Sequence, residues 1–321
     1  MTRRVGRFGI QAALVAVAAV WGGTFVMVKD AVSRYPLYSF LGWRFAIAVV
    51  AFTILFPRAV QRADLATIRA GVFAGTFLTA GYVFQTWGLE DTTASKAAFI
   101  TGMFVVITPA LQAVLLRRLP RTATLVGIGA AVVGLWLLSG GSAGAWTVGD
   151  TRVLLCAVAY SAHMIVLGSV SEQRDVLALT FVQLVTIALL CGGIAVVREG
   201  VSVPHDASVI ASLLVTGVLA SAVAFAVQTW AQRSIPPART ALILVNEPAF
   251  GGLFGWLAGE ALGLRGLAGA AMILGGMVLS EVAGARVEAR ERVVLEPALE
   301  GIPVPVVESF DAGKASDQSG S

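Results

Sequence analysis

The chain is poor in charged residues, cysteine and histidine, and each shortage excludes a class of protein. Charged residues make up 13% of the 321 positions and hydrophobic residues 57%, against roughly 25% and 45–50% in soluble domains. So little charge cannot cover a water-exposed surface, and we expect lipid to be the solvent of this chain. The two cysteines, Cys156 and Cys191, lie in apolar runs, which argues against a disulfide framework or a paired metal site. We therefore expect no metal and no cofactor.

The net charge of +4 does not indicate a nucleic-acid partner, because the arginines are spread over several short loops. In a membrane protein, such a distribution reports topology. The phosphate-binding pattern Gly-x-x-x-x-Gly-Lys-Ser/Thr does not occur in the sequence, so hydrolysis of ATP by that route is excluded.

Long apolar runs dominate the sequence. A helix needs about 20 apolar residues to cross the hydrocarbon core of a bilayer, and by this rule the sequence predicts ten spans: 8–28, 37–57, 68–89, 95–116, 123–139, 151–169, 177–197, 208–232, 238–258 and 265–284. The first run follows Arg3, Arg4 and Arg7 as a secretory signal would, but it extends to Val28. We interpret it as a span that the mature protein retains.

The basic residues predict the orientation of these spans. With the N-terminus inside, the inside segments hold fifteen arginines: Arg3, Arg4, Arg7, Arg58, Arg62, Arg69, Arg117, Arg118, Arg121, Arg174, Arg233, Arg239, Arg286, Arg290 and Arg292. The outside loops and span ends hold only Lys29, Arg34, Lys96, Arg152, Arg198 and Arg265. This positive-inside bias predicts a multi-pass protein of the plasma membrane with both termini in the cytoplasm.

The two halves of the chain repeat each other. The tripeptide Gln-Thr-Trp occurs at positions 85–87 and 228–230, and Trp21 aligns with Tyr160, Arg44 with Gln183 and Pro109 with Pro248. The glycines Gly127 and Gly134 recur as Gly269 and Gly276. We divide the chain into a first repeat (1–140), a second repeat (141–284) and a cytoplasmic tail (285–321) that is either disordered or a short surface helix.

An odd number of spans in each repeat predicts that the second repeat is inverted. The loop charges agree, since Glu90 and Asp91 join the third and fourth spans whereas Arg233 lies in the corresponding second-half connection. The predicted fold is thus all-α and integral to the membrane, with ten transmembrane helices in two inverted five-helix repeats. The alternative is chance similarity between apolar helices.

Several motifs resemble those of the drug/metabolite transporter superfamily, in particular its EamA-type ten-helix branch. They are Trp21-Gly22-Gly23-Thr24-Phe25, Arg44-Phe45, Ala94-Ser95-Lys96-Ala97-Ala98-Phe99-Ile100 before Pro109, Ala238-Arg239-Thr240-Ala241 before Glu247-Pro248, and Gly259-Glu260. The resemblance covers residues 8 to about 284. One departure is Leu119-Pro120, which stands where the second half has Gly259-Glu260. The resemblance implies transport of a small metabolite, and proteins of this kind move amino acids, sugars, nucleosides and toxic cations.

We therefore expect a secondary transporter that works by alternating access, exports a small amino-acid-like or amine-bearing molecule and has no enzymatic activity. Its partners would be that molecule and the lipid bilayer. Importing a sugar- or nucleoside-type metabolite is one alternative. Another is a membrane enzyme acting on lipid-linked substrates, but His163 and His205 stand apart, in a span and in a loop. A channel or receptor is a third alternative, which does not require an inverted duplication.

Polar and aromatic side chains within spans are the candidate site residues, because lipid offers them no partner. The predicted substrate-binding set is Trp21, Thr24, Tyr82, Gln85, Tyr160, His163, Gln228, Asn246 and Glu247. Glu247 precedes Pro248, which removes a backbone donor, and it is the predicted coupling residue. Each side chain also has a structural alternative: Glu247 at a kink, Gln85, Gln228, Asn246 and His163 as hydrogen bonds between helices, and the aromatic rings as core packing.

Two further features have a structural interpretation. Arg44 could bind anions, but we favour an anchoring role in which its long stem lets the guanidinium reach the headgroups. The glycine-rich spans that contain Gly127, Gly134, Gly269 and Gly276 predict close helix packing, either against each other or across a homodimer.

Overall fold

The protein is helical throughout the part of the chain that the structure describes. This computed structural model describes residues 7–92, 94–116, 122–138, 146–200, 202–257 and 263–300, and no strand occurs among them. The first half contains α1 (Arg7–Arg34), α2 (Leu37–Leu55), α3 (Leu65–Gly88), α4 (Ala94–Gly102), α5 (Phe104–Leu116) and α6 (Thr122–Leu138). The second half contains α7 (Val148–Val170), α8 (Val176–Arg198), α9 (Ala207–Gly217), a π-helix (Val218–Val223), α10 (Ala224–Ala231), α11 (Pro237–Leu244), α12 (Glu247–Leu257) and α13 (Gly263–Glu300).

Each of the ten apolar segments predicted from the sequence is mainly helical in its described residues. Seven helical segments in the described ranges are long and apolar enough to cross a membrane, and the helix at Thr122–Leu137 is apolar but shorter. α3 is not one of the seven, because it carries several polar residues, among them Thr79, Tyr82 and Gln85. The chain is a multi-pass membrane protein.

Three of the predicted spans are interrupted. In the first half, α4 ends at Gly102 and α5 begins at Phe104. In the second half, α11 ends at Leu244 and α12 begins at Glu247, immediately before Pro248. The third interruption is the π-helix between α9 and α10, a form that occurs mostly as short insertions at functional sites.

α13 runs beyond the predicted end of the last span at residue 284. The helix continues to Glu300, so the beginning of the predicted tail is helical. Residues 301–321 lie outside the described residues, as do Arg3, Arg4, Arg117, Arg118, Arg121, Gly259 and Glu260, on which parts of the orientation and motif predictions depend.

Aspartate side chains fix the starts of several helices. Asp64 accepts a hydrogen bond from the backbone N–H of Thr67 at the start of α3 (2.8 Å), and Asp175 caps α8 through Leu177 and Ala178. Thr147 and Asp150 form a reciprocal capping box at the start of α7. These bonds satisfy backbone donors that a helix leaves free at its first turn.

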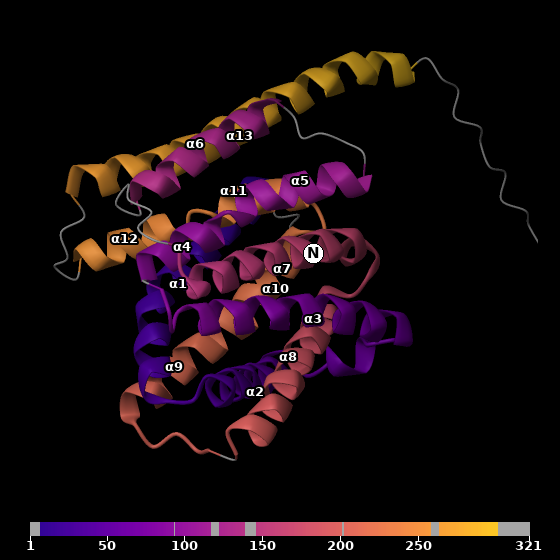
Figure 1. The fold of residues 1–321 in the computed structure, drawn as a ribbon. Helices are drawn as coiled ribbons and strands as arrows, with labels where there is room; N and C mark the ends of the chain where they lie inside the picture. The colour runs from indigo at the N-terminus through magenta and orange to yellow at the C-terminus, as the bar shows by residue number, and fades with distance from the viewer. Residues whose placement is uncertain are drawn as a thin grey trace, which may run out of the picture.

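Glycines bring α6 and α13 into close contact, and these two helices lie side by side in Figure 1. A methyl group added to Gly127 would lie 2.7 Å from the carbonyl oxygen of Gly276, and one added to Gly134 would lie 2.6 Å from that of Gly269. Two alternatives were compatible with the sequence, contact between these two helices or contact across a homodimer. In the structure, the two helices pack against each other within one chain. Because the residue numbers rise along α6 as they fall along α13, the two helices are antiparallel.

The remaining helices pack across the two halves of the chain. α3 lies against α7 and α8, α2 against α8 and α9, and α1 against α12 and α10. These contacts interleave the halves, so that side chains from both surround the middle of the molecule. The two largest hydrophobic clusters meet there, since Trp21 and residues of α10 pack against both.

Candidate functional site

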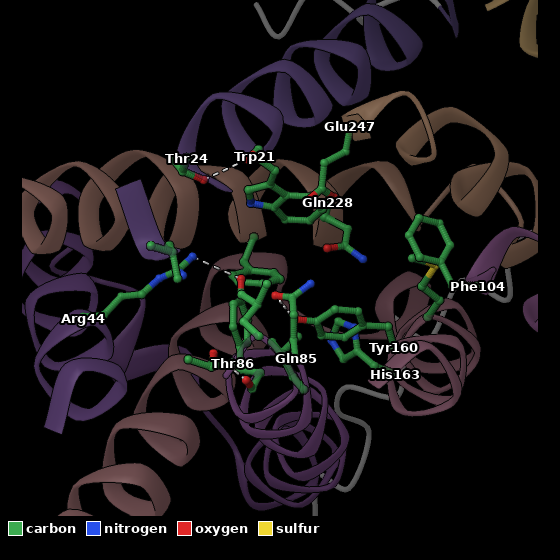
Figure 2. A pocket seen from close by; sticks show the side chains of 16 residues that line it. Trp21, Thr24, Arg44, Gln85, Thr86, Phe104, Tyr160, His163, Gln228 and Glu247 are labelled. Atoms are coloured by element: carbon green, nitrogen blue, oxygen red, sulfur yellow. Dashed lines mark hydrogen bonds between the residues drawn. The ribbon is translucent and has the colours of Figure 1, made fainter. Parts of the chain in front are cut away.

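A cavity lies at the centre of the bundle, between helices of both halves (Figure 2). It holds about 60 Å³ of free space. Eight of the nine predicted substrate-binding residues line it: Trp21, Thr24, Tyr82, Gln85, Tyr160, His163, Gln228 and Glu247. The structure thus brings side chains that are far apart in the sequence together around one cavity.

Arg44 is the positive group of the cavity and is 4% exposed. Its Nε–H donates to the Ser221 hydroxyl (3.0 Å), a terminal N–H donates to the Tyr82 hydroxyl (3.3 Å), and the guanidinium lies 4.7 Å from the centre of the Tyr82 ring. The prediction that Arg44 reaches the headgroups is wrong. Ser221 belongs to the π-helix, and together with the Tyr82 ring it holds the side chain inside the bundle.

Glu247 is the negative group and is the first residue of α12. Gly22 of α1 packs against the Glu247 backbone carbonyl, where a side chain on residue 22 would collide. This close approach holds the start of α12 against α1, next to Trp21. Figure 2 shows Glu247 and Arg44 reaching the cavity from different helices.

Neither charge has an ion-pair partner within 4.0 Å in the described part of the chain. Transferring an unpaired charge into the bilayer centre costs roughly 2.5–3.5 kcal/mol on insertion scales. The cavity therefore holds one basic and one acidic side chain that do not pair directly with each other.

The two repeated glutamines line the cavity but differ in their hydrogen bonds. Gln85 accepts from the Tyr160 hydroxyl and donates to the Thr101 hydroxyl, both at 3.4 Å. Gln228 donates its Nε2 to Oε1 of Gln232 (3.2 Å), and its own Oε1 is buried without a hydrogen-bond partner among the described residues.

Hydrogen-bond chemistry fixes the orientation of these amides. Gln232 Nε2 donates to the backbone carbonyl of Met164 (2.7 Å), and a carbonyl oxygen only accepts. The Oε1 of Gln232 therefore faces Gln228, which must present its Nε2. The acceptor of Gln228 that has no partner among the described residues is therefore its Oε1.

Aromatic rings form much of the remaining wall. Trp21 donates its indole N–H to the Ala220 carbonyl (2.8 Å), and its ring lies 5.6 Å from that of Phe225. Tyr82 packs edge-on against Tyr160 at 5.7 Å and against Phe225 at 6.1 Å. Phe225 was missing from the predicted set, although its position three residues before Gln228 puts both on one helix face.

His163 and Asn246 form hydrogen bonds to neighbouring groups. Gln183 Nε2 donates to the Leu179 carbonyl, so its Oε1 accepts the Nε2–H of His163 at 2.8 Å. Asn246 is not among the residues that line the cavity. Its amide nitrogen donates to the Ile243 carbonyl (2.8 Å) at the break between α11 and α12.

A multi-pass helical bundle around a central cavity that is lined by ionisable side chains and free hydrogen-bonding groups is the architecture of a membrane transporter. The chain matches the model of the EamA-like transporter family twice, over residues 7–140 and 147–281. It therefore belongs to the EamA-like transporter family, and the two matches confirm the duplication.

Individual relatives agree with this assignment. A protein of Archaeoglobus fulgidus described as an uncharacterized transporter is 32% identical over 241 residues, which is 75% of each chain. The uncharacterized transporter YoaV of Bacillus subtilis is 22% identical over 255 residues, or 76% of this chain and 86% of the relative. A solved crystal structure has the same fold, with a TM-score of 0.73 at 16% identity over 88% of this chain and 100% of the other.

Proposed function

We propose that this protein is a secondary transporter that exports a small amino-acid-like or amine-bearing metabolite across the plasma membrane by alternating access. The observation that carries the proposal is the central cavity, in which the isolated carboxylate of Glu247 faces aromatic rings. A carboxylate attracts a cationic amine, and aromatic faces add cation–π attraction of about 0.5–2 kcal/mol.

The transport cycle requires ten spans in two inverted repeats, and the helix directions support this topology. α6 and α13 are antiparallel at the Gly127–Gly276 contact. α3 and α8 are parallel, because Gly71 packs on Val182 and Gly75 on Thr186. Alternate crossing from a cytoplasmic N-terminus gives these same relative directions, and it leaves both termini in the cytoplasm.

Reciprocal packing of the two halves also supports the inversion. α1 packs against α12 and α10, and its counterpart α7 packs against α5, α4 and α3. Exchanging the halves thus maps these contacts onto each other, as a two-fold axis in the membrane plane requires. Rocking one half against the other would then open the cavity to each side in turn.

The interrupted helices supply places where such a movement can occur. The breaks at Met103 and at Val245–Asn246 lie in corresponding spans of the two repeats. Half-helix ends near the centre of the membrane are typical of transporter binding sites, because they free backbone groups and permit local bending. Glu247 lies directly at the second break.

Proton coupling is proposed to act through Glu247. A single carboxylate that holds either the cationic group of the substrate or a proton cannot hold both at once. The substrate leaves on one side of the membrane when a proton takes its place, so the inward proton gradient drives export. This competition requires no further titratable group.

Flux measurements in liposomes test the proposal. Purified protein is reconstituted, and labelled amino acids, amines and sugars are screened with and without a pH gradient, for wild type and for Glu247→Gln. We expect gradient-stimulated flux of one substrate class, and we expect the variant to abolish the stimulation. Gradient-stimulated flux that is the same in Glu247→Gln would remove Glu247 from the mechanism, and absence of flux for every compound would contradict transport of these metabolites.

A further inference from the structure

We infer that the cavity binds a zwitterion, with the carboxylate of the substrate held at Arg44 and its ammonium group at Glu247 and Gln228. This inference rests on the proposed transport function and specifies its substrate class. An amine alone would use only the negative group of the cavity. The structure carries a complete set of groups for both ends of an amino acid.

The anion-binding end consists of Arg44 and Tyr82. Ser221 and Tyr82 engage two of the guanidinium N–H groups, and a guanidinium has five. The remaining donors have no carboxylate within ion-pair distance in the described ranges. The Tyr82 hydroxyl accepts from Arg44, so its own proton is available to donate. A substrate carboxylate offers two oxygens that match these donors.

The cation-binding end consists of Glu247 and Gln228. Gln228 is 1% exposed, and its Oε1 is a buried acceptor without a partner among the described residues. A buried acceptor left unsatisfied costs roughly 1–3 kcal/mol, which a ligand that donates to it would recover. An ammonium group has three donors, enough for the Glu247 carboxylate and the Gln228 amide oxygen together.

Arg44 and Glu247 are too far apart to form an ion pair with each other, and this separation favours a ligand that carries both charges. Arg44 and Glu247 line one cavity yet lie outside the 4.0 Å range of an ion pair. A molecule with a charge of each sign would pair with both groups at once, whereas an amine or an acid would leave one of them unpaired. The aromatic faces of Trp21, Tyr160 and Phe225 remain for the apolar part of the substrate.

Matched triplets of compounds test this assignment. Each consists of an amino acid, its decarboxylated amine and its deaminated acid: leucine, 3-methylbutylamine and 4-methylpentanoate; phenylalanine, phenethylamine and 3-phenylpropanoate; serine, ethanolamine and 3-hydroxypropanoate. Exchange of labelled amino acid across liposomes without a pH gradient is measured with each unlabelled compound as competitor. Exchange needs no net proton movement, so Glu247→Gln can be assayed as well.

For at least one triplet in wild type, we expect the amino acid to compete at least tenfold better than either truncated compound. In Arg44→Gln, the amine should compete as well as the amino acid, and the acid should still compete less well. In Glu247→Gln, the acid should compete as well as the amino acid, and the amine should still compete less well. A purely structural role would weaken all three competitors alike. Arg44→Lys, which keeps the charge, should retain part of the discrimination, and Arg69→Gln, at an exposed arginine of α3, is the control.

Two results would overturn the inference without touching the transport function. One is equal competition by amine and amino acid in wild type, with no change in their ratio in Arg44→Gln, which would indicate an amine carrier. The other is that no compound of the three triplets is exchanged or competes, while the protein transports a sugar and this flux depends on Glu247. Failure of the transport function itself is a different outcome, in which no compound of any class crosses the membrane.

Discussion

Arg44 of the first repeat donates its Nε–H to the hydroxyl of Ser221 in the second repeat at a distance of 3.0 Å. This bond joins the buried guanidinium of α2 to the π-helix of the second repeat. Ser221 itself is fully buried, so the bond is shielded from water. It determines where the guanidinium lies relative to the Tyr82 ring.

Replacement of this hydroxyl should weaken substrate binding. A hydrogen bond to a charged group contributes about 1.5–3 kcal/mol, so Ser221→Ala should raise the KM of transport by about tenfold or more at an unchanged amount of folded protein. The concentration dependence of flux measures the change. Ser33→Ala, at an exposed hydroxyl of α1, is the control, and an unaltered KM in Ser221→Ala would refute the role of the bond.

The glycine contact between α6 and α13 predicts a difference between two neighbouring glycines. A side chain at Gly127 meets the Gly276 carbonyl, whereas one at Gly129 meets nothing within 4 Å. Gly127→Val should therefore destabilise the protein by about 1–3 kcal/mol through overpacking, and Gly129→Ala should have little effect. Thermal unfolding in detergent measures both. Equal unfolding temperatures for the two variants would mean that the helices do not pack at this contact.

Gly81 makes room for the Tyr160 ring in the cavity. A methyl group at residue 81 would collide with this ring, and the Tyr160 hydroxyl would lose its bond to Gln85. Gly81→Ala should slow flux severalfold and leave unfolding less affected than flux. Gly193→Ala, with open space around it, serves as the matched control. Wild-type flux in Gly81→Ala would exclude Tyr160 from the transport path.

The aspartate caps predict an acid-sensitive contribution to stability. Hydrogen bonding from Thr67 lowers the pKa of Asp64, and hydrogen bonding from Ser208 lowers that of Asp206, in each case below the ordinary value of 3.8. A carboxyl whose pKa is lower in the folded state stabilises the fold above its unfolded pKa, and this contribution is lost as the pH falls through the folded pKa.

The corresponding experiment compares unfolding temperatures at pH 5 and pH 3. Asn also caps helices but does not titrate, so Asp64→Asn with Asp206→Asn should show a smaller decrease on acidification than wild type. Both aspartates are exposed, and the difference should be small. An identical decrease in the two proteins would assign acid sensitivity to other groups.

Much of the fold could be predicted from the sequence, because lipid imposes simple rules on length, polarity and charge. All ten apolar segments are mainly helical where the structure describes them, and the repeated Gln85 and Gln228 line one cavity. The position of Arg44 could not be predicted. A single arginine in an apolar run is compatible with reaching the headgroups or with burial, and only tertiary packing against Ser221 and Tyr82 decides between them.

The helix breaks were predictable only in part. Pro248 follows the break between α11 and α12 closely, whereas Pro109 lies inside α5 and the first-half break falls six residues earlier, at Met103. The π-helix at Val218–Val223 contains no proline, and no sequence pattern indicated it. Phe225 had a usable signal in its spacing from Gln228, but aromatic residues in spans are more often core packing.

The most direct test of the central claim is proton-gradient-driven flux in liposomes that contain wild type or Glu247→Gln at equal amounts of folded protein. We predict that an inward proton gradient stimulates substrate efflux in wild type, and that Glu247→Gln abolishes this stimulation. Gradient-stimulated efflux of the same size in both proteins would contradict the account, because the isolated carboxylate of the cavity would then have no part in transport.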